Sequence, residues 1–307
     1  MRLIKTTTLE LEEFPGLVPS YAILSHTWGK EEPHTPMGFF KILHASLRAR
    51  SDDLSYLWVD TCCIDKTSSA ELSEAINSMY GWYRNSTVCY AYLSDVPPLS
   101  PSGAAPHVIS SSPFRRSRWF KRGWTLQELL APKNLTFFSS DWSEISTKQL
   151  VAPLLQEITG IHATYLLRTK HITSASVAER MSWVSDRTTT RPEDVAYCLL
   201  GVFDVHMPLI YGEGARAFVR LQEEIIKISE DHSIFAWTTL WADPLRCTLL
   251  APDPICFHTS GDYGVMSPSA KGEDGGGESV KPFVMTNVGL TVHLKLIRHV
   301  EETWYSP

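Results

Sequence analysis

Hydrophobic positions in the first half of the chain follow two alternating periods, which predicts an α/β domain. Strands are predicted by short apolar runs at residues 21–25, 56–59, 88–93 and 135–138. Helices are predicted by apolar residues at helical spacing around residues 39–47, 71–83 and 124–130. Ser68 and Glu71 form a capping box before the second helix, and Pro132 ends the third. Strands that alternate with helices indicate a parallel, doubly wound sheet.

The second half of the chain has a different pattern. Amphipathic helices are predicted at residues 151–159, 176–186, 193–202 and 214–229. Short β-like runs at residues 234–237, 283–286 and 289–296 then flank a Gly-rich stretch at residues 271–279. We therefore expect three parts: an α/β domain at 1–150, a helical region at 151–232 and a β-rich region at 233–307, the last incomplete.

Composition narrows the class of protein and of partner. The chain has 307 residues, of which 43% are hydrophobic, as in an ordinary globular protein. Its 28 basic and 34 acidic residues give a net charge of -6, which argues against nucleic acid as the main partner. There is neither a signal-peptide core nor an uninterrupted membrane span, so we expect a cytoplasmic protein without a membrane partner. Six cysteines without a CxxC pair indicate reduced thiols and no metal site.

Polar clusters follow two of the predicted strands. Open α/β sheets bind ligands at the carboxyl ends of their strands, so we expect these clusters to meet at one site. The candidate substrate-binding residues in them are Ser25, His26, Trp28, Gly29, Asp60, Cys63 and Asp65.

The segment RGWTLQELL at residues 122–130 is the strongest candidate for chemistry. Trp124 and Glu128 are four residues apart and share one helix face, with Arg122 beside them. An acid, an aromatic plane and a cation gathered in this way make the segment the best candidate for chemistry in the chain. The alternative is that Glu128 is a solvated helix residue or an ion-pair partner of Arg122.

Several candidates also have structural interpretations. His26 can tie its loop down, and Asp60 and Asp65 can act as helix-cap or turn residues. A nucleophilic pair of Cys63 with His26 lacks a recognisable orienting group, and buried structural cysteines are common.

Two further segments imitate ligand-binding motifs. Basic and aromatic residues alternate at residues 114–122, as in sites that bind single-stranded nucleic acid. Because the chain is net acidic, a surface segment is the better interpretation. The run Gly212 to Ala217 imitates a dinucleotide fingerprint, yet Pro208 interrupts the strand it would need. A helix-entry turn explains this run better.

Five motifs in order resemble the fungal heterokaryon incompatibility (HET) domain: MRLIKTTTLELEEF, YAILSHTWG, LWVDTCCIDK, ELSEAINSMYGWYRNSTVCYAYLSDV and SRWFKRGWTLQELLAP. Residues 176–214 and the FAW at 235–237 resemble an extension found in many long HET proteins. The resemblance implies a cell-death effector that acts when genetically unlike fungal cells fuse and that is activated by self-association.

The HET domain is in turn similar to the Toll/interleukin receptor (TIR) domain, which has a flavodoxin-like sheet. Enzymatic TIR domains cleave NAD at the nicotinamide glycosidic bond with a glutamate in a Trp-Cys-x-x-Glu-Leu-like helix. Here Trp124 to Leu129 matches that helix, with Thr125 in place of the cysteine. The resemblance implies NAD as a substrate rather than a cofactor, with Glu128 as the catalytic acid. Trp124 or Trp28 would stack on a ring, and Arg122 would pair with the pyrophosphate. A non-catalytic TIR-like oligomerisation module is the alternative.

Overall fold

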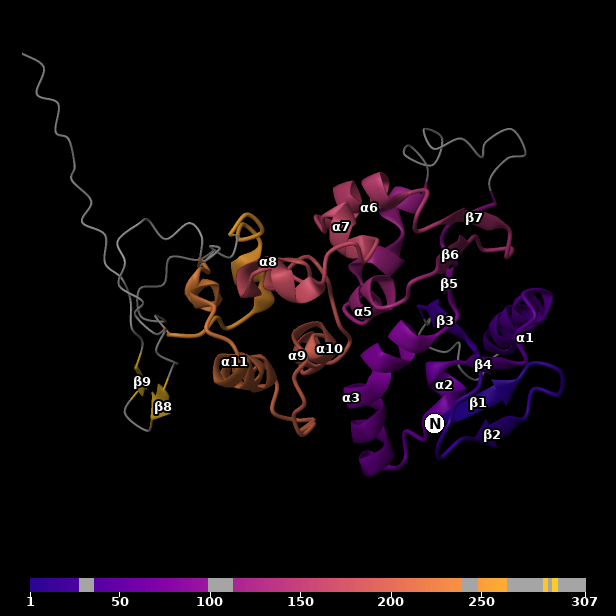
Figure 1. Cartoon of the computed structure of the whole chain (residues 1–307), viewed down its shortest axis with the longest axis horizontal. Coiled ribbons are helices and arrows are strands. Elements are labelled where there is room, and N and C mark those ends of the chain that lie inside the picture. The colour runs from indigo at the N-terminus through magenta and orange to yellow at the C-terminus, as the bar shows by residue number, and fades with distance from the viewer. Residues whose placement is uncertain (28–35, 99–112, 239–247, 264–283, 287–288, 292–307) are drawn as a thin grey trace, which may run out of the picture.

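A seven-stranded mixed sheet forms the centre of the N-terminal half (Figure 1). The computed structural model describes residues 1–27, 36–98, 113–238, 248–263, 284–286 and 289–291. Trp28, Gly29 and the Gly-rich stretch at 271–279 lie outside the described residues.

The sheet has the order β2-β1-β4-β3-β5-β6-β7. Its strands are β1 (Arg2–Lys5), β2 (Leu11–Glu13), β3 (Ala22–His26), β4 (Tyr56–Trp58), β5 (Val88–Tyr92), β6 (Leu135–Phe138) and β7 (Glu144–Thr147). The four strands predicted from apolar runs form the parallel centre, β4-β3-β5-β6. Numbered along the chain, this centre has the order 2-1-3-4 of flavodoxin-like doubly wound sheets. The predicted α/β fold is confirmed.

The three remaining strands are antiparallel and were absent from the prediction. β1 pairs with both β2 and β4, and β7 pairs with β6, so antiparallel strands cover both edges of the parallel centre. The edge strands are short and partly exposed, with two buried residues in each of β1 and β7 and none in β2. Such strands lack the continuous apolar run that marks a buried parallel strand.

Helices cover both faces of the sheet (Figure 1). α1 (Pro36–Ser51) lies on one face, and α3 (Ser69–Asn85) and α5 (Thr125–Leu130) lie on the other. The predicted cap of α3 is present, because the Glu71 N–H donates to Ser68 Oγ at 3.3 Å. A short helix, α2 (Asp60–Cys63), follows β4 directly.

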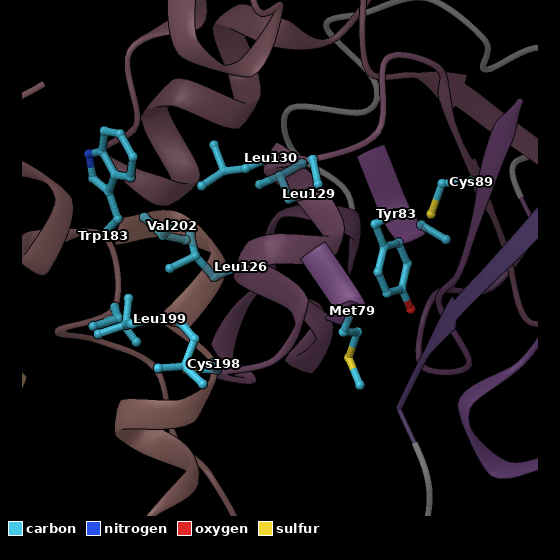
Figure 2. Close-up of a cluster of buried hydrophobic side chains, with 14 of the residues drawn as sticks. Met79, Tyr83, Cys89, Leu126, Leu129, Leu130, Trp183, Cys198, Leu199 and Val202 are labelled. Carbon is cyan, nitrogen blue, oxygen red and sulfur yellow. The ribbon is translucent and has the colours of Figure 1, made fainter. Parts of the chain in front are cut away.

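The helical region packs on the outer side of α3 and α5. Its helices are α6 (Ala152–Thr159), α7 (Ala163–Leu166), α8 (Val177–Ser182), α9 (Asp194–Tyr197), α10 (Leu200–Phe203) and α11 (Arg216–Ile228). α7 contacts α5, and α10 contacts α3. Figure 2 shows Leu126 of α5 and Val202 of α10 within one cluster of buried side chains. Every residue of α5 is buried as a result. The predicted division at residues 150 and 232 stays a prediction.

One predicted β run is wrong. Residues His232–Phe235 form a 3-10 helix, because the Asp231 carboxylate accepts the Ser233 N–H and starts a helical turn. The two later β-like runs do contain strands, because β8 (Val284–Thr286) and β9 (Gly289–Thr291) form an antiparallel pair. None of the helices in the described ranges is long and apolar enough to cross a membrane.

Gly201 of α10 packs closely against Tyr80 of α3. A Cβ at this position would lie 2.1 Å from Tyr80 Cβ, so Gly201→Ala is expected to push α10 away from α3. The free energy of unfolding should fall by about 2–3 kcal/mol, as in other overpacked cores. Gly81→Ala, whose Cβ would meet nothing within 4 Å, is the matched control and should stabilise α3 slightly. Urea unfolding of the two variants measures the difference, and equal effects would contradict this packing.

Candidate functional site

A cavity of about 360 Å³ opens at the carboxyl ends of β3 and β4. This volume lies in the range of small-molecule sites. Its lining residues from the strand ends are Leu24, His26, Thr27 and Asp60. The chain winds to β4 on one side of β3 and to β5 on the other, so the cavity lies beside the topological switch point of the sheet. Ligands bind at this place in doubly wound folds.

Glu128 contributes a buried carboxylate to the cavity. Glu128 is only 7% exposed to solvent, because α5 is enclosed by α3, β3 and α7. The Ser25 hydroxyl donates a hydrogen bond to Glu128 Oε2. Ser25 Oγ in turn accepts the indole N–H of Trp119 at 2.8 Å. Since Ser25 and Trp119 are both fully buried, this chain of hydrogen bonds fixes the orientation of the carboxyl group.

The environment of Glu128 raises its pKa to about 8. Burial is the main cause, because the charged form loses its hydration. The hydrogen bond from Ser25 lowers the pKa, and the negative charge of Asp60 raises it. With this pKa, Glu128 is largely protonated at pH 7. A cationic ligand would favour the ionised form, so the site is suited to a positively charged group.

A second carboxylate, Asp194 from α9, lies on the wall formed by the helical region. The Tyr211 hydroxyl donates to Asp194 Oδ1 at 3.1 Å, and Trp124 also hydrogen-bonds this carboxylate. Burial raises the pKa of Asp194, whereas these two donors lower it. The indole of Trp124 is thus held against the cavity by a residue 70 positions later in the chain.

The cations of the site are more exposed than its acids. Arg122 is half-buried, whereas Lys66 and Arg191 are exposed, and all three line the cavity. The Lys66 Nζ lies 3.7 Å from Asp60 Oδ2. The cavity is consequently acidic in its interior and basic at its rim.

The structure brings most of the predicted site residues together. Those that line the cavity are His26, Asp60, Arg122, Trp124 and Glu128. Ser25 does not line the cavity itself but hydrogen-bonds Glu128. Arg191, Asp194 and Tyr211 were missed. They lie within the segment that resembles the HET extension, but no strand end or helix period points to them.

Besides Ser25, two predicted site residues, Cys63 and Asp65, do not line the cavity. Cys63 is buried and its Sγ accepts the Val59 N–H at 3.4 Å; burial raises its thiol pKa to about 12, which excludes a thiolate at neutral pH. The Asp65 carboxylate accepts the N–H and the hydroxyl of Thr67 and so closes a turn. Cys63 and Asp65 thus make the local contacts that their structural interpretations describe.

The two segments that imitate ligand-binding motifs, residues 114–122 and 212–217, also have structural explanations. In residues 114–122 the aromatic side chains are buried and the Arg115, Arg116 and Arg118 side chains are exposed. Arg122 donates to Thr190 and forms no ion pair with Glu128 among the described residues. The backbone N–H groups of Gly212 and Gly214 donate to the Glu193 carboxylate, which holds a turn before α11.

The comparisons with known proteins agree with the resemblance seen in the sequence. Residues 21–104 match the family described as heterokaryon incompatibility protein (HET), and residues 216–296 match a domain of unknown function (DUF8212). The vegetative incompatibility protein HET-E-1 of Podospora anserina is 44% identical over 225 residues, which are 69% of this chain and 16% of that protein. No solved structure matches the chain. On these matches the chain belongs to the heterokaryon incompatibility (HET) domain family.

Proposed function

We propose that this chain cleaves NAD between nicotinamide and ribose, with Glu128 as the essential acid. The observation that carries the proposal is the buried carboxylate of Glu128, fixed by Ser25 and opening onto a cavity at the switch point of a doubly wound sheet. A strongly perturbed carboxyl group in a concave site is a typical sign of catalysis. The resemblance of residues 124–129 to the catalytic helix of TIR domains supports the same residue.

The chemistry requires only one carboxylate. When the glycosidic C–N bond breaks, its electron pair moves onto the cationic nicotinamide ring, which leaves as a neutral molecule. The ribose carbon becomes oxocarbenium-like, and the buried Glu128 carboxylate stabilises this positive charge. Water then adds to the carbon and loses a proton, which gives ADP-ribose. Asp60 and Asp194 add negative potential around the same charge.

The biological setting of the proposal comes from the family. HET-E-1 is named for vegetative incompatibility, and this chain shares 225 aligned residues with it. We propose the corresponding role here: a cytoplasmic effector of cell death after fusion of unlike fungal cells, activated when copies associate. NAD depletion would be the cause of death.

Nicotinamide release from NAD tests the proposal. Purified full chain is incubated with NAD, in dilute solution and with a crowding agent, and nicotinamide and ADP-ribose are quantified by chromatography. We expect equimolar products, and Glu128→Gln should slow release at least about 100-fold. Glu224→Gln, a surface carboxylate paired with Lys227 on α11, is the matched control and should match the wild type. Self-association that kills cells equally well with Glu128→Gln would instead support the non-catalytic module.

A further inference from the structure

Two arginines at the rim of the cavity come from different parts of the chain. Arg122 precedes α5, and Arg191 belongs to the helical region, yet both line the cavity. Among the described residues, no carboxylate oxygen lies within 4.0 Å of either guanidinium group. Neither guanidinium group is therefore taken up by a direct ion pair, although the Arg191 charge acts on Glu193 and Asp194 at longer range.

The backbone fixes the two arginines relative to each other. Thr188 donates its N–H to Lys121 O at 2.7 Å, and Gly123 donates its N–H to Thr188 O at 2.9 Å. A Cβ at Gly123 would lie 2.5 Å from Thr189 Cγ2, so any larger residue at this position would displace the Thr189 side chain. Arg122 Nη1 and Nη2 both lie 3.2 Å from Thr190 Oγ1, directly before Arg191 in the chain. The two side chains thus start from adjacent points of the rim.

Arg191 is also held in place before any ligand binds. Its guanidinium carbon lies 4.4 Å from the ring centroid of Tyr211, and the Tyr211 hydroxyl is anchored by Asp194. Stacking on an aromatic ring leaves the guanidinium N–H groups free to donate, and a planar guanidinium matches the geometry of phosphate oxygens. A pre-oriented cation loses little entropy on binding.

We propose that Arg191 and Arg122 bind the diphosphate of a dinucleotide, so that the helical region completes the site and sets its selectivity for dinucleotides over nucleosides. The identification of the dinucleotide as NAD rests on the proposed function; the diphosphate site does not. This arrangement orients the substrate, with its cationic ring towards Glu128 and Asp60 in the interior and its phosphates at the basic rim. The adenosine would lie outside the cavity.

Calorimetric titration with ADP-ribose tests the site, because this probe carries the diphosphate but no cleavable nicotinamide. We expect Arg191→Gln in the full chain to weaken ADP-ribose binding about tenfold or more, and Arg191→Lys to restore part of it. Arg116→Gln, an exposed arginine away from the cavity, removes the same charge and should change nothing. Nicotinamide riboside, titrated into Glu128→Gln protein with and without Arg191→Gln, should bind equally in both cases.

The outcomes separate this inference from the proposed function. Equal ADP-ribose affinities for Arg191→Gln and Arg116→Gln, or no ADP-ribose binding to the wild type, would overturn the diphosphate site, even if NAD is cleaved. Arg191-dependent binding of ADP-ribose without nicotinamide release from NAD would keep the diphosphate site and overturn the proposed function. A loss of nicotinamide riboside binding equal to that of ADP-ribose would show that Arg191 only supports the fold of the pocket.

Discussion

Glu128→Gln is expected to stabilise the folded chain at neutral pH while it removes the activity. In the folded protein the pKa of Glu128 is about 8, against an ordinary value of 4.5 for an exposed glutamate. Between these values the folded state holds a proton that the unfolded state has lost, so the wild type loses stability as pH rises from about 4.5 to 8. A glutamine is neutral at every pH and can still accept the Ser25 hydroxyl.

The expected gain follows from the size of the pKa shift. One pKa unit corresponds to about 1.4 kcal/mol, so Glu128→Gln should raise the free energy of unfolding by on the order of 3 kcal/mol at pH 7. The gain should vanish near pH 4.5. Urea denaturation at pH 4.5, 6 and 7.5 measures it, with Glu224→Gln as the surface control that shows no such trend. A variant that is less stable than the wild type at pH 7 would show that the cavity does not disfavour the carboxylate.

The rate of NAD cleavage is expected to rise with pH through the pKa of Glu128. The proposed mechanism uses the ionised carboxylate, and only a small fraction of Glu128 is ionised well below pH 8. Because kcat/KM reports the free enzyme, it should increase about tenfold per pH unit below about 8 and level off above it. The kcat profile should level off at a lower pH than the kcat/KM profile, because the bound cationic ring favours the ionised form of Glu128.

Initial rates of nicotinamide release at saturating and at low NAD, from pH 5.5 to 9, give both profiles. A kcat/KM that falls above pH 8 would contradict the electrostatic role, because it would require Glu128 as a proton donor. A profile without a transition near pH 8 would mean that Glu128 does not titrate in the reaction.

The sequence predicts the parallel centre of the sheet well, because buried parallel strands are continuous apolar runs. The run from Leu135 to Phe138 matches β6 at both ends. The edge strands cannot be predicted from apolar runs, because β2, for example, is largely exposed and has only Leu11 as an apolar residue. β1 pairs with β2 over separations of 7 to 11 residues and with β4 over separations of 51 to 53 residues, and no apolar run marks this double pairing.

The candidate site is predictable to the extent that it follows strand ends. His26 and Asp60 line the cavity because the carboxyl ends of parallel strands share one edge. Cys63 belongs to the same sequence cluster as Asp60, but the short α2 turns its side chain into the core, and no strand-end rule anticipates a helix there. Arg191 and Asp194 reach the cavity only through the packing of the helical region on α3 and α5, so nothing local in the sequence identifies them.

The most direct test of the account is the initial rate of nicotinamide release by Glu128→Gln relative to the wild type at pH 8, with both proteins shown to be folded by their urea transitions. The account predicts a variant that is at least as stable as the wild type and at least about 100-fold slower. Equal rates of release from two folded proteins would contradict the central claim that the Glu128 carboxylate cleaves NAD.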